Sequence, residues 1–581
     1  MIRLIVFIYL VCFAFVELKA QSNVNSKLVY RDSRVRDYIT PAAIVWKSDT
    51  TGEYIKNAEN LLNSGNGQAD LSKTNLCILK NSKEHHASII FDFGKEIHGG
   101  LQIVTDMFPN KLGEKVHLRF GESLSETISE VIPEAGAATN EHAMRDFEIT
   151  LPWLGKLDIG NTGFRFVRID LLSNNAQLNL KEFNGIFIYR DIPYLGSFTC
   201  NDSLLNRIWQ TGAYTVHLNM QEYLWDGIKR DRLVWVGDLH PEIKTINSVF
   251  GYNEVVPKSL DLIRDITPVE EWMNGITSYS MWWVIIHKDW YLNNGDLEYL
   301  KQQREYLLAL LEKFASMVGE DGKEQLTGRR FLDWPSSPYP EAIDAGYHAL
   351  LKMTLEAGVL LSFELEEDET AKLCQNKAAL MEKVVPDHVD SKQAAALLAL
   401  ANSISEKEAN AVIEKDGAQR FSTFYGYYML LAMAKADNYS GALEIIKAYW
   451  GGMLQLGATT FWEDFNIEWM ENAGRIDEMP KEGSVDVHAT YGDYCYQGLR
   501  HSFCHGWASG PTAWLSEHVL GIKVLEPGCK KIAIEPNLGN LQWVEGTYPT
   551  PQGLIKVRHE KQANGKIISD LTVPAGIEVV E

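Results

Sequence analysis

Residues 298–311 read EYLKQQREYLLALL, with apolar side chains three and four positions apart. This spacing is that of an amphipathic α-helix that packs by one face. The same spacing recurs, with Gly, Asp or Pro in the linkers, at 202–221, 278–292, 297–318, 346–365, 368–384, 391–402, 425–436 and 439–455. Repeated helix hairpins can form a bundle, a solenoid or a closed α/α toroid, and periodicity does not choose among them. The sequence therefore predicts a central helical domain over residues 197–518.

Short alternating segments flank this helical region on both sides. The clearest of them are residues 87–94, 115–121 and 163–169. They are rich in β-branched and aromatic residues and are separated by Gly, Asn and Pro, which predicts an antiparallel β-sandwich over residues 51–196. A polar, poorly patterned leader precedes it at 21–50. Short strands return later and predict a small C-terminal β-domain over residues 519–581.

Length and composition narrow the class of protein. At 581 residues the chain is longer than one core usually supports, so several domains are expected. The formal net charge of −22 argues against nucleic acid or an anionic membrane as a partner and suits a neutral glycan. The cysteines of the expected mature chain are scattered without a metal-binding spacing, so we predict neither a zinc site nor a specific disulfide.

The first 20 residues have the pattern of an export signal. Arg3 precedes an apolar run at 4–16, and the small residue Ala20 comes just before Gln21. The apolar run is shorter than a comfortable membrane span. We expect cleavage after Ala20 and export to a periplasm or beyond, with a retained signal anchor as the alternative.

Residues 225–242, WDGIKRDRLVWVGDLHPE, concentrate charged and aromatic side chains. Asp226, Asp231 and Asp238 lie among basic residues and close to Trp235. Carboxylates can protonate a leaving oxygen, hold hydroxyl groups or activate water, and an indole offers an apolar face to a pyranose. The alternative is a solvated turn between two helices, which would not need so many large apolar side chains. The segment therefore predicts a sugar site.

Two later regions carry further candidates. Residues 457–465, GATTFWEDF, place Glu463 directly after two aromatic residues, a setting that can desolvate a carboxylate. A capping acid at a helix start is the alternative for Glu463. Asp333 and Trp334 form an acidic-aromatic pair, and His505 lies in a Gly-rich segment; for the tryptophan and the histidine, packing in a hydrophobic core is the alternative.

The first of these motifs resembles the signature of glycoside hydrolase family 78, the α-L-rhamnosidases. The matching residues are Asp226, Arg230, Asp231, Arg232, Leu233, Trp235, Gly237 and Asp238. In many members the general acid is a glutamate four residues before the tryptophan, and this chain has the shorter Asp231 there. The family's Thr-Thr-x-Trp-Glu element, which carries the general base, matches at Glu463. The histidine that contacts substrate or supports the base matches at His505.

The resemblance implies an N-terminal antiparallel β-sandwich, a central (α/α)6 barrel and a small C-terminal β-domain. It also implies an exported, inverting α-L-rhamnosidase that needs no cofactor, with Asp231 as general acid and Glu463 as general base. Arg230 and Arg232 would orient carboxylates. The residues expected to bind the rhamnose-containing substrate are Asp226, Arg230, Trp235, Asp238, Asp333, Trp334, Trp462 and His505.

Several alternatives remain open. Glu242 could replace Asp231 as the acid, and Asp464 or Glu468 could replace Glu463 as the base. The aspartate at position 231 could instead reflect a related (α/α)-barrel glycosidase that acts on another terminal sugar or on glycans bearing uronic acids. The chain could also be a catalytically inactive glycan-binding protein that keeps the aromatic residues.

Overall fold

The computed structural model describes residues 32–130, 145–489 and 499–580. The expected signal peptide, the first part of the expected leader and Cys495 lie outside the described residues. From Val35 onward the chain folds as one unit. Within the described ranges, no helix combines the length and the apolar character needed to cross a membrane.

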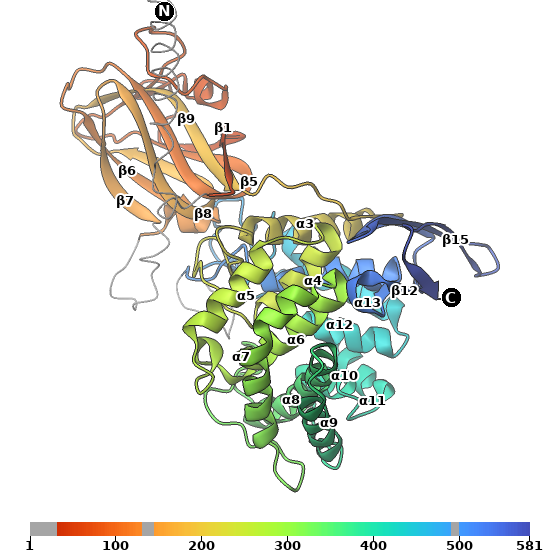
Figure 1. Cartoon of the computed structure of the whole chain (residues 1–581). Helices are drawn as coiled ribbons and strands as arrows, with labels where there is room; N and C mark the ends of the chain where they lie inside the picture. Colours follow the sequence, from red (N-terminus) through yellow and green to blue (C-terminus); the bar gives the residue numbers. More distant parts are fainter. Residues whose placement is uncertain (1–31, 131–144, 490–498, 581) are drawn as a thin grey trace, which may run out of the picture. The chain divides into compact units, whose positions relative to one another are not determined.

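The described part of the N-terminal domain is a nine-stranded antiparallel sheet (Figure 1). The strand order is β3-β4-β9-β5-β8-β6-β7, with β1 paired to β9 and β2 to β5. The strands are β1 (Val35–Ile39), β2 (Ala43–Lys47), β3 (Ile55–Lys56), β4 (Cys77–Lys80), β5 (Ser88–Asp106), β6 (Glu114–Gly121), β7 (Asp146–Leu151), β8 (Gly155–Leu171) and β9 (Gln177–Tyr189). A short helix, α2 (Leu124–Ile128), follows β6. The predicted antiparallel β-domain is confirmed.

This sheet begins earlier than the sequence predicts, because the expected leader at 21–50 contains β1 and β2. β1 has mostly exposed side chains and joins the sheet through its backbone, with Val35 opposite Tyr189. In β2 the pairing register shifts between Ile44 and Trp46. A strand that buries little, or that contains a bulge, lacks the alternating pattern by which a strand is recognised in sequence. The leader prediction is therefore wrong for these two strands.

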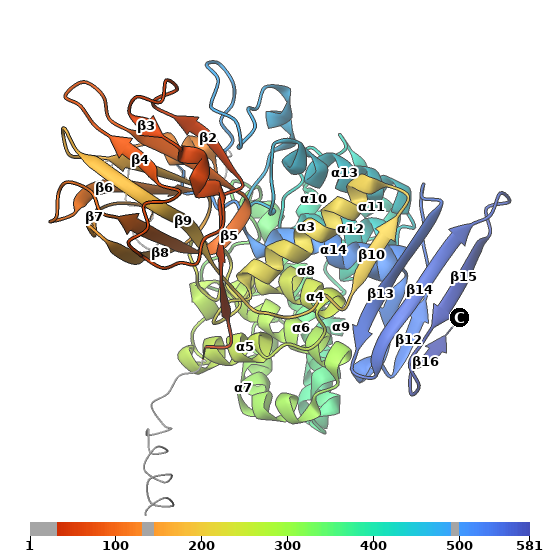
Figure 2. The same cartoon turned by 90° about the horizontal axis from the view of Figure 1, so that it is seen from above.

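The central domain is helical, and all the helices predicted from periodicity are present with somewhat shifted ends. The helices are α3 (Ser203–Asn219), α4 (Leu239–Val249), α5 (Val255–Ile266), α6 (Thr277–Asn294), α7 (Leu297–Ser316), α8 (Pro340–Glu364), α9 (Asp368–Met381), α10 (Lys392–Leu400), α11 (Glu406–Glu414), α12 (Gly426–Lys435), α13 (Tyr439–Gln455) and α14 (Gly510–Trp514). α4, α5 and α11 were not predicted. In α4 nearly all side chains are buried, the polar ones included. This helix packs against both α3 and α14 (Figure 2).

The C-terminal domain consists of two small sheets, ordered β10-β13-β14-β15 and β11-β12-β16. Their strands are β10 (Ser197–Cys200), β11 (Ile522–Val524), β12 (Lys531–Ile534), β13 (Trp543–Thr550), β14 (Gly553–Lys561), β15 (Ile567–Thr572) and β16 (Glu578–Val580). β10 lies at the start of the range predicted to be helical, yet Ser197 pairs with Thr547 of β13 (Figure 2). Because these two residues are far apart in the sequence, no pattern near either of them predicts that they pair.

Candidate active site

The candidate site is a cavity that brings together the segment between α3 and α4, the segment before α8 and the segment before α14. It is lined by Asp226, Arg230, Asp231, Trp235, Asp238, Ile276, Tyr279, Arg329, Phe331, Trp334, Glu463, His505 and Trp507. Of the residues predicted to be catalytic or to bind substrate, all but Asp333 and Trp462 line this cavity.

Asp226 holds together the loop that carries the first motif. Its buried carboxylate accepts hydrogen bonds from the backbone N–H groups of Asp231 (2.8 Å) and Leu233 (3.0 Å). Burial, with the charge of Asp231 adding to it, raises the pKa of Asp226 to about 7, although the two backbone N–H groups oppose the shift. The carboxyl group therefore titrates near neutrality.

Arg230 connects the two carboxylates predicted to be catalytic. Its guanidinium donates a hydrogen bond to Glu463 Oε2, and its Nη1 lies 3.5 Å from Asp231 Oδ1. Glu463 Oε2 also accepts from the backbone N–H of Ser502 (3.1 Å), and Asp231 Oδ2 accepts from the indole N–H of Trp235 (3.2 Å). Two acids that lie far apart in the sequence are thus fixed beside one guanidinium.

Asp238 and His505 are both buried next to Asp226. His505 Nε2 lies 3.9 Å from a carboxyl oxygen of each aspartate, and Tyr279 donates its hydroxyl hydrogen to Asp238. Burial raises the pKa of Asp238 well above its usual range, against the opposing hydrogen bond from Tyr279. Burial, together with Arg230, lowers the pKa of His505 well below its usual range. A neutral imidazole both donates and accepts a hydrogen bond, as a sugar hydroxyl requires.

Trp462 and Asp333 lie behind the cavity wall, so their predicted direct contacts with substrate are not supported by their placement. Trp462 is fully buried and stacks on Phe503, with ring centroids 4.3 Å apart. The Asp333 carboxylate is also buried and accepts hydrogen bonds from Gln393 (3.1 Å) and Ser422 (2.7 Å). Each is adjacent in sequence to a residue that does line the cavity, and only the path of the backbone decides which neighbour faces it.

The alternative acids also lie outside the cavity lining. Glu242 is buried beside Gly506, where an added Cβ would come within 2.1 Å of its carboxyl carbon. Burial raises the pKa of Glu242 well above its usual range, with Asp238 adding to the shift. Asp464 is buried, and Glu468 is exposed.

Arg232 turns away from the cavity. Its guanidinium donates to the backbone carbonyl of Asn161 in β8. It therefore braces the first motif against the N-terminal domain, in place of the predicted orientation of a catalytic carboxylate.

Five cavity residues were not among the predicted site residues: Ile276, Tyr279, Arg329, Phe331 and Trp507. Phe331 and Trp507 are close in sequence to Trp334 and His505, so the neighbouring motifs were their only signal. No sequence motif indicated Tyr279, because only the packing of α6 brings its side chain to Asp238.

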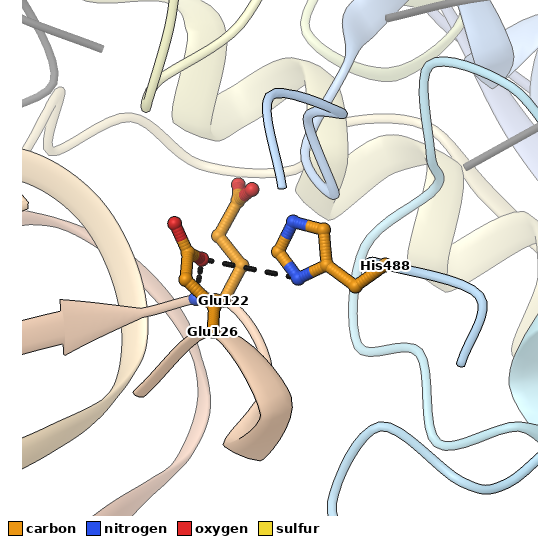
Figure 3. A group of neighbouring side chains, drawn as sticks. All are labelled: Glu122, Glu126 and His488. Carbon is orange, nitrogen blue, oxygen red and sulfur yellow. Dashed lines mark hydrogen bonds and ion pairs between the residues drawn. The ribbon is translucent and has the colours of Figure 1, made fainter. Parts of the chain in front are cut away.

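The side chains of Glu122, Glu126 and His488 form a buried cluster (Figure 3). Glu122, Glu126 of α2 and His488 place ligand-type atoms within 4.8 Å of one another, a spacing that could hold a metal ion. The ammonium group of Lys229, however, lies 2.9 Å from Glu122 Oε2, 3.2 Å from Glu126 Oε1 and 3.2 Å from His488 Nε2. It also donates to the carbonyl of His501 (3.1 Å). The lysine thus places a positive charge among these three side chains, and Arg145 Nε lies 3.6 Å from Glu126 Oε1.

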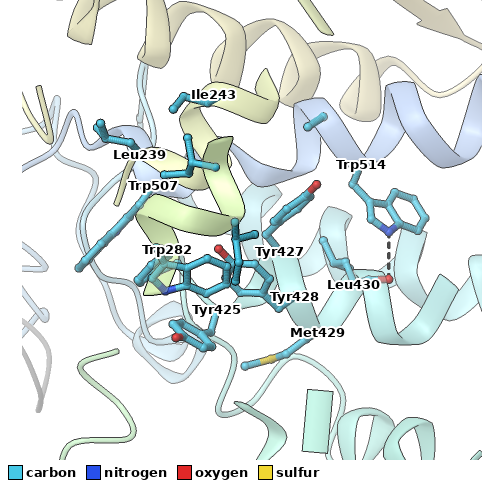
Figure 4. Close-up of a cluster of buried hydrophobic side chains, with 14 of the residues drawn as sticks. Leu239, Ile243, Trp282, Tyr425, Tyr427, Tyr428, Met429, Leu430, Trp507 and Trp514 are labelled. Atoms are coloured by element: carbon cyan, nitrogen blue, oxygen red, sulfur yellow. Dashed lines mark hydrogen bonds between the residues drawn. The ribbon is translucent and has the colours of Figure 1, made fainter. Parts of the chain in front are cut away.

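Aromatic side chains of α6, α12 and the segment before α14 form a buried core next to the cavity (Figure 4). Trp282 stacks on Tyr428, with ring centroids 4.7 Å apart. Trp282 and its neighbour Trp283 are both fully buried. Trp507 joins core and cavity, because it lines the cavity and stacks on Phe424 at 4.9 Å.

Comparison with known protein families identifies both the central and the C-terminal domain. The bacterial alpha-L-rhamnosidase 6 hairpin glycosidase domain matches residues 193–519, and the bacterial alpha-L-rhamnosidase C-terminal domain matches residues 521–580. An alpha-L-rhamnosidase of Alteromonas sp. (strain LOR) is 24% identical over 537 residues, which cover 84% of this chain and 55% of that protein. The chain thus spans about half the length of this curated relative.

Solved structures share the fold. The GH78 family rhamnosidase of Bacillus sp. GL1 has a TM-score of 0.71 at 21% identity, covering 90% of this chain and 55% of that chain. The rhamnosidase of Klebsiella oxytoca, solved with rhamnose bound, has a TM-score of 0.67 at 19% identity, covering 84% of this chain and 96% of that chain. The fold is that of a six-hairpin glycosidase, which confirms the predicted barrel. The chain belongs to the bacterial α-L-rhamnosidase family.

Proposed function

We propose that this chain is a glycoside hydrolase that removes terminal α-L-rhamnose from glycans or glycosides with inversion of configuration. Family membership supports the substrate class, and the rhamnose bound to the Klebsiella relative supports the sugar. The observation that carries the proposal is the pairing of Asp231 and Glu463 with one guanidinium in one cavity.

In the proposed reaction, Asp231 protonates the glycosidic oxygen as the bond to the anomeric carbon breaks. Glu463 takes a proton from a water molecule that attacks the same carbon from the opposite face. Inversion requires room for this water, with the two carboxyl groups roughly 6.5–9.5 Å apart. Arg230 fixes the spacing of the two acids, and the indole N–H of Trp235 orients Asp231.

The remaining polar groups would hold the sugar. Asp226, Asp238 and His505 would accept or donate hydrogen bonds to ring hydroxyls, and Trp235 and Trp334 would form apolar walls. The cavity measures about 60 Å³, and the half-buried Trp235 and Trp334 both belong to its lining.

A second candidate is a related glycosidase that acts on another terminal sugar. The observation that favours it is the short Asp231 in the position where many family members have glutamate. An acid that is one methylene shorter requires the glycosidic oxygen to lie closer to the backbone, and a different sugar could satisfy this.

The decisive experiment is turnover of a panel of aryl glycosides by the purified protein. We expect cleavage of the α-L-rhamnoside, and proton NMR of the first product should show β-L-rhamnose before mutarotation. α-L-Rhamnose as the first product would refute inversion. Turnover of another glycoside alone would refute the rhamnosidase assignment, and turnover of none would favour a glycan-binding protein.

We also propose that the protein is exported, on the strength of the apolar run at 4–16 and the small residue Ala20. Mass spectrometry of the protein purified from its native host should find Gln21 as the first residue. A mature protein that still begins at Met1 would contradict this.

A further inference from the structure

A second and larger cavity adjoins the candidate active site. It measures about 280 Å³. Its lining includes Pro335 and Ser336, directly after Trp334, and also Phe465 and Asn466, shortly after Glu463. Two separate segments therefore run from the wall of one cavity into the wall of the other. Tyr339, at 60% exposure, marks its opening to solvent.

Lys392, the first residue of α10, lines this second cavity with a buried side chain. The residue is 1% exposed, and its Nζ donates one hydrogen bond, to the carbonyl of Gly417 (2.7 Å). Among the residues that the structure describes, no carboxylate lies within 4.0 Å of this ammonium. A buried ammonium has three donors and is costly to bury without a negative partner.

The charges around Lys392 leave the cavity lining with a positive excess. Its charged residues are Lys392, Arg420 and Asp390. Asp390 is already paired, because Lys415 Nζ lies 2.8 Å from its carboxylate and Arg420 Nη1 lies 3.6 Å away. Arg420 Nη2 also lies 3.8 Å from Asp416, so the excess positive charge is that of Lys392. The N-terminal end of α10 adds positive partial charge from its backbone N–H groups. This lining contrasts with a chain whose net charge is −22.

The pKa of Lys392 also reflects its burial without a carboxylate close by. Burial lowers the pKa of its ammonium to about 8, with Arg420 adding to the shift and Asp416 and Asp390 opposing it. A negative ligand group in the cavity would stabilise the charged form of the lysine.

We propose that this cavity binds an anionic sugar unit of the substrate, on the leaving-group side of the cleaved bond, with its negative group paired to Lys392. The proposal rests on the proposed function, in which the adjoining cavity holds the terminal sugar. The volume is close to the lower end of ligand pockets, roughly 300–1,000 Å³, and suits a single sugar ring. Phe421 and Phe465 offer apolar faces to that ring.

The test compares two disaccharides of the same linkage on the full chain: α-L-rhamnosyl-glucuronate and α-L-rhamnosyl-glucose. We expect kcat/KM to favour the glucuronate by about tenfold or more, mainly through KM, because a charge-assisted hydrogen bond is lost with the neutral sugar. Lys392→Met should bring the ratio of the two values close to one. Lys407→Met, an exposed lysine of α11 outside the cavity, is the matched control and should keep the wild-type ratio.

Because the ratio compares two substrates on one preparation, partial misfolding of a variant does not change it. A third substrate, α-L-rhamnosyl-glucose 6-sulfate, distinguishes the two sources of negative charge. A preference for this compound over the glucuronate would assign the cavity to sulfated sugars. Equal kcat/KM on all three, or an unchanged ratio in Lys392→Met, would overturn the proposal while the rhamnosidase assignment stands.

If the protein cleaves no rhamnoside at all, the proposed function fails, and the cavity is tested by binding. Calorimetry with free glucuronate and with glucose 6-sulfate should then show binding to the wild type that Lys392→Met weakens at least about tenfold. Absence of binding to the wild type would overturn the assignment of an anion-binding cavity as well.

Discussion

Arg230 is the side chain on which the proposed chemistry depends, because it contacts Glu463 and Asp231 at once. A planar guanidinium with five donors can hold two carboxylates in fixed directions, which an ammonium group cannot do. Burial raises the pKa of Asp226 to about 7 and that of Asp238 well above its usual range. These two acids thus lie in different surroundings from the two that contact Arg230.

Replacing Glu463 by glutamine should abolish turnover and leave the fold intact. The amide keeps the shape of the side chain and an oxygen that can accept from Ser502, but it cannot take a proton from water. We expect kcat to fall at least about a hundredfold. The melting temperature should fall as well, because the buried Arg230 loses its charged partner, and circular dichroism of the variant should still show the native fold. Glu468→Gln, at an exposed acid of the same region, is the control and should remain active. If Glu468→Gln loses its activity and Glu463→Gln keeps it, the base is Glu468.

Asp231→Asn should discriminate between leaving groups. A general acid matters most when the departing oxygen is basic, so the variant should lose activity on a natural glycan and retain much more on an aryl rhamnoside with an acidic phenol. Measuring kcat/KM on both substrates tests this. Equal losses would assign Asp231 to binding, and Glu242 would be the next acid to replace.

Asp226 should make stability depend on pH. Its folded pKa of about 7 lies above the ordinary 3.8, so its contribution to stability is full below about pH 4 and is lost as the pH rises through 7. Asp226→Asn removes this titration. Relative to the wild type, the melting temperature of the variant should therefore rise between pH 5 and pH 8. A difference that stays constant with pH would contradict the shifted pKa.

At the scale of the element, the N-terminal sheet shapes the loop that carries the first motif. Gly163 of β8 lies against this loop, and an added Cβ would meet Ile228 Cγ1 at 2.6 Å and Lys229 N at 2.8 Å. Side chains can turn aside, but a backbone nitrogen moves only with the loop. The glycine therefore allows the sheet to approach Arg230 and its neighbours.

Gly163→Ala should displace the loop and so reduce both activity and stability. Overpacking of this kind costs about 1–3 kcal/mol, and we expect a lower melting temperature together with a loss of kcat/KM. Gly474→Ala is the control, because its nearest neighbour, Ser484 Oγ, would lie at an ordinary 3.4 Å. Wild-type activity and melting in Gly163→Ala would show that the loop position does not depend on this contact.

At the scale of the whole molecule, the N-terminal and helical domains share buried charge. Glu122 and Glu126 come from the N-terminal domain, and Lys229 and His488 come from the helical domain. Glu122 Oε2 also accepts from the backbone N–H of Phe503 (2.9 Å), close to the Ser502 N–H that binds Glu463. The N-terminal domain is thus part of the support of the candidate site.

Lys229→Met should strongly destabilise the protein, because the buried Glu122 loses its positive partner and Glu126 keeps only Arg145, whose Nε lies 3.6 Å away. The cost of breaking a buried pair is about 3–5 kcal/mol. Adding Glu122→Gln to the variant should recover part of the melting temperature, since one uncompensated acid is removed. Lys301→Met, at a lysine whose side chain is 53% exposed, is the control. A melting temperature in Lys229→Met equal to that of the control would refute the role of the cluster.

The sequence by itself determined the kinds of element and the chemistry of the site. Helical periodicity located α3, α6–α10, α12 and α13, and short alternating segments located the β-domains. The dense motif at 225–242 and the acid after two aromatic residues predicted a sugar site, and the resemblance to the α-L-rhamnosidase family singled out Asp231 and Glu463 as the proposed catalytic pair. These features are local, because periodicity and composition are read within a few turns of chain.

Only the tertiary structure decided which residues meet. It brought Tyr279 to Asp238, placed Trp462 and Asp333 behind the cavity wall, and filled the cluster of Glu122 and Glu126 with the ammonium of Lys229. It also paired β10 with a strand near the C-terminus. In each case the partners are distant in sequence or face opposite sides of one backbone, and the direction of a side chain is fixed by packing against another element rather than by its own neighbours.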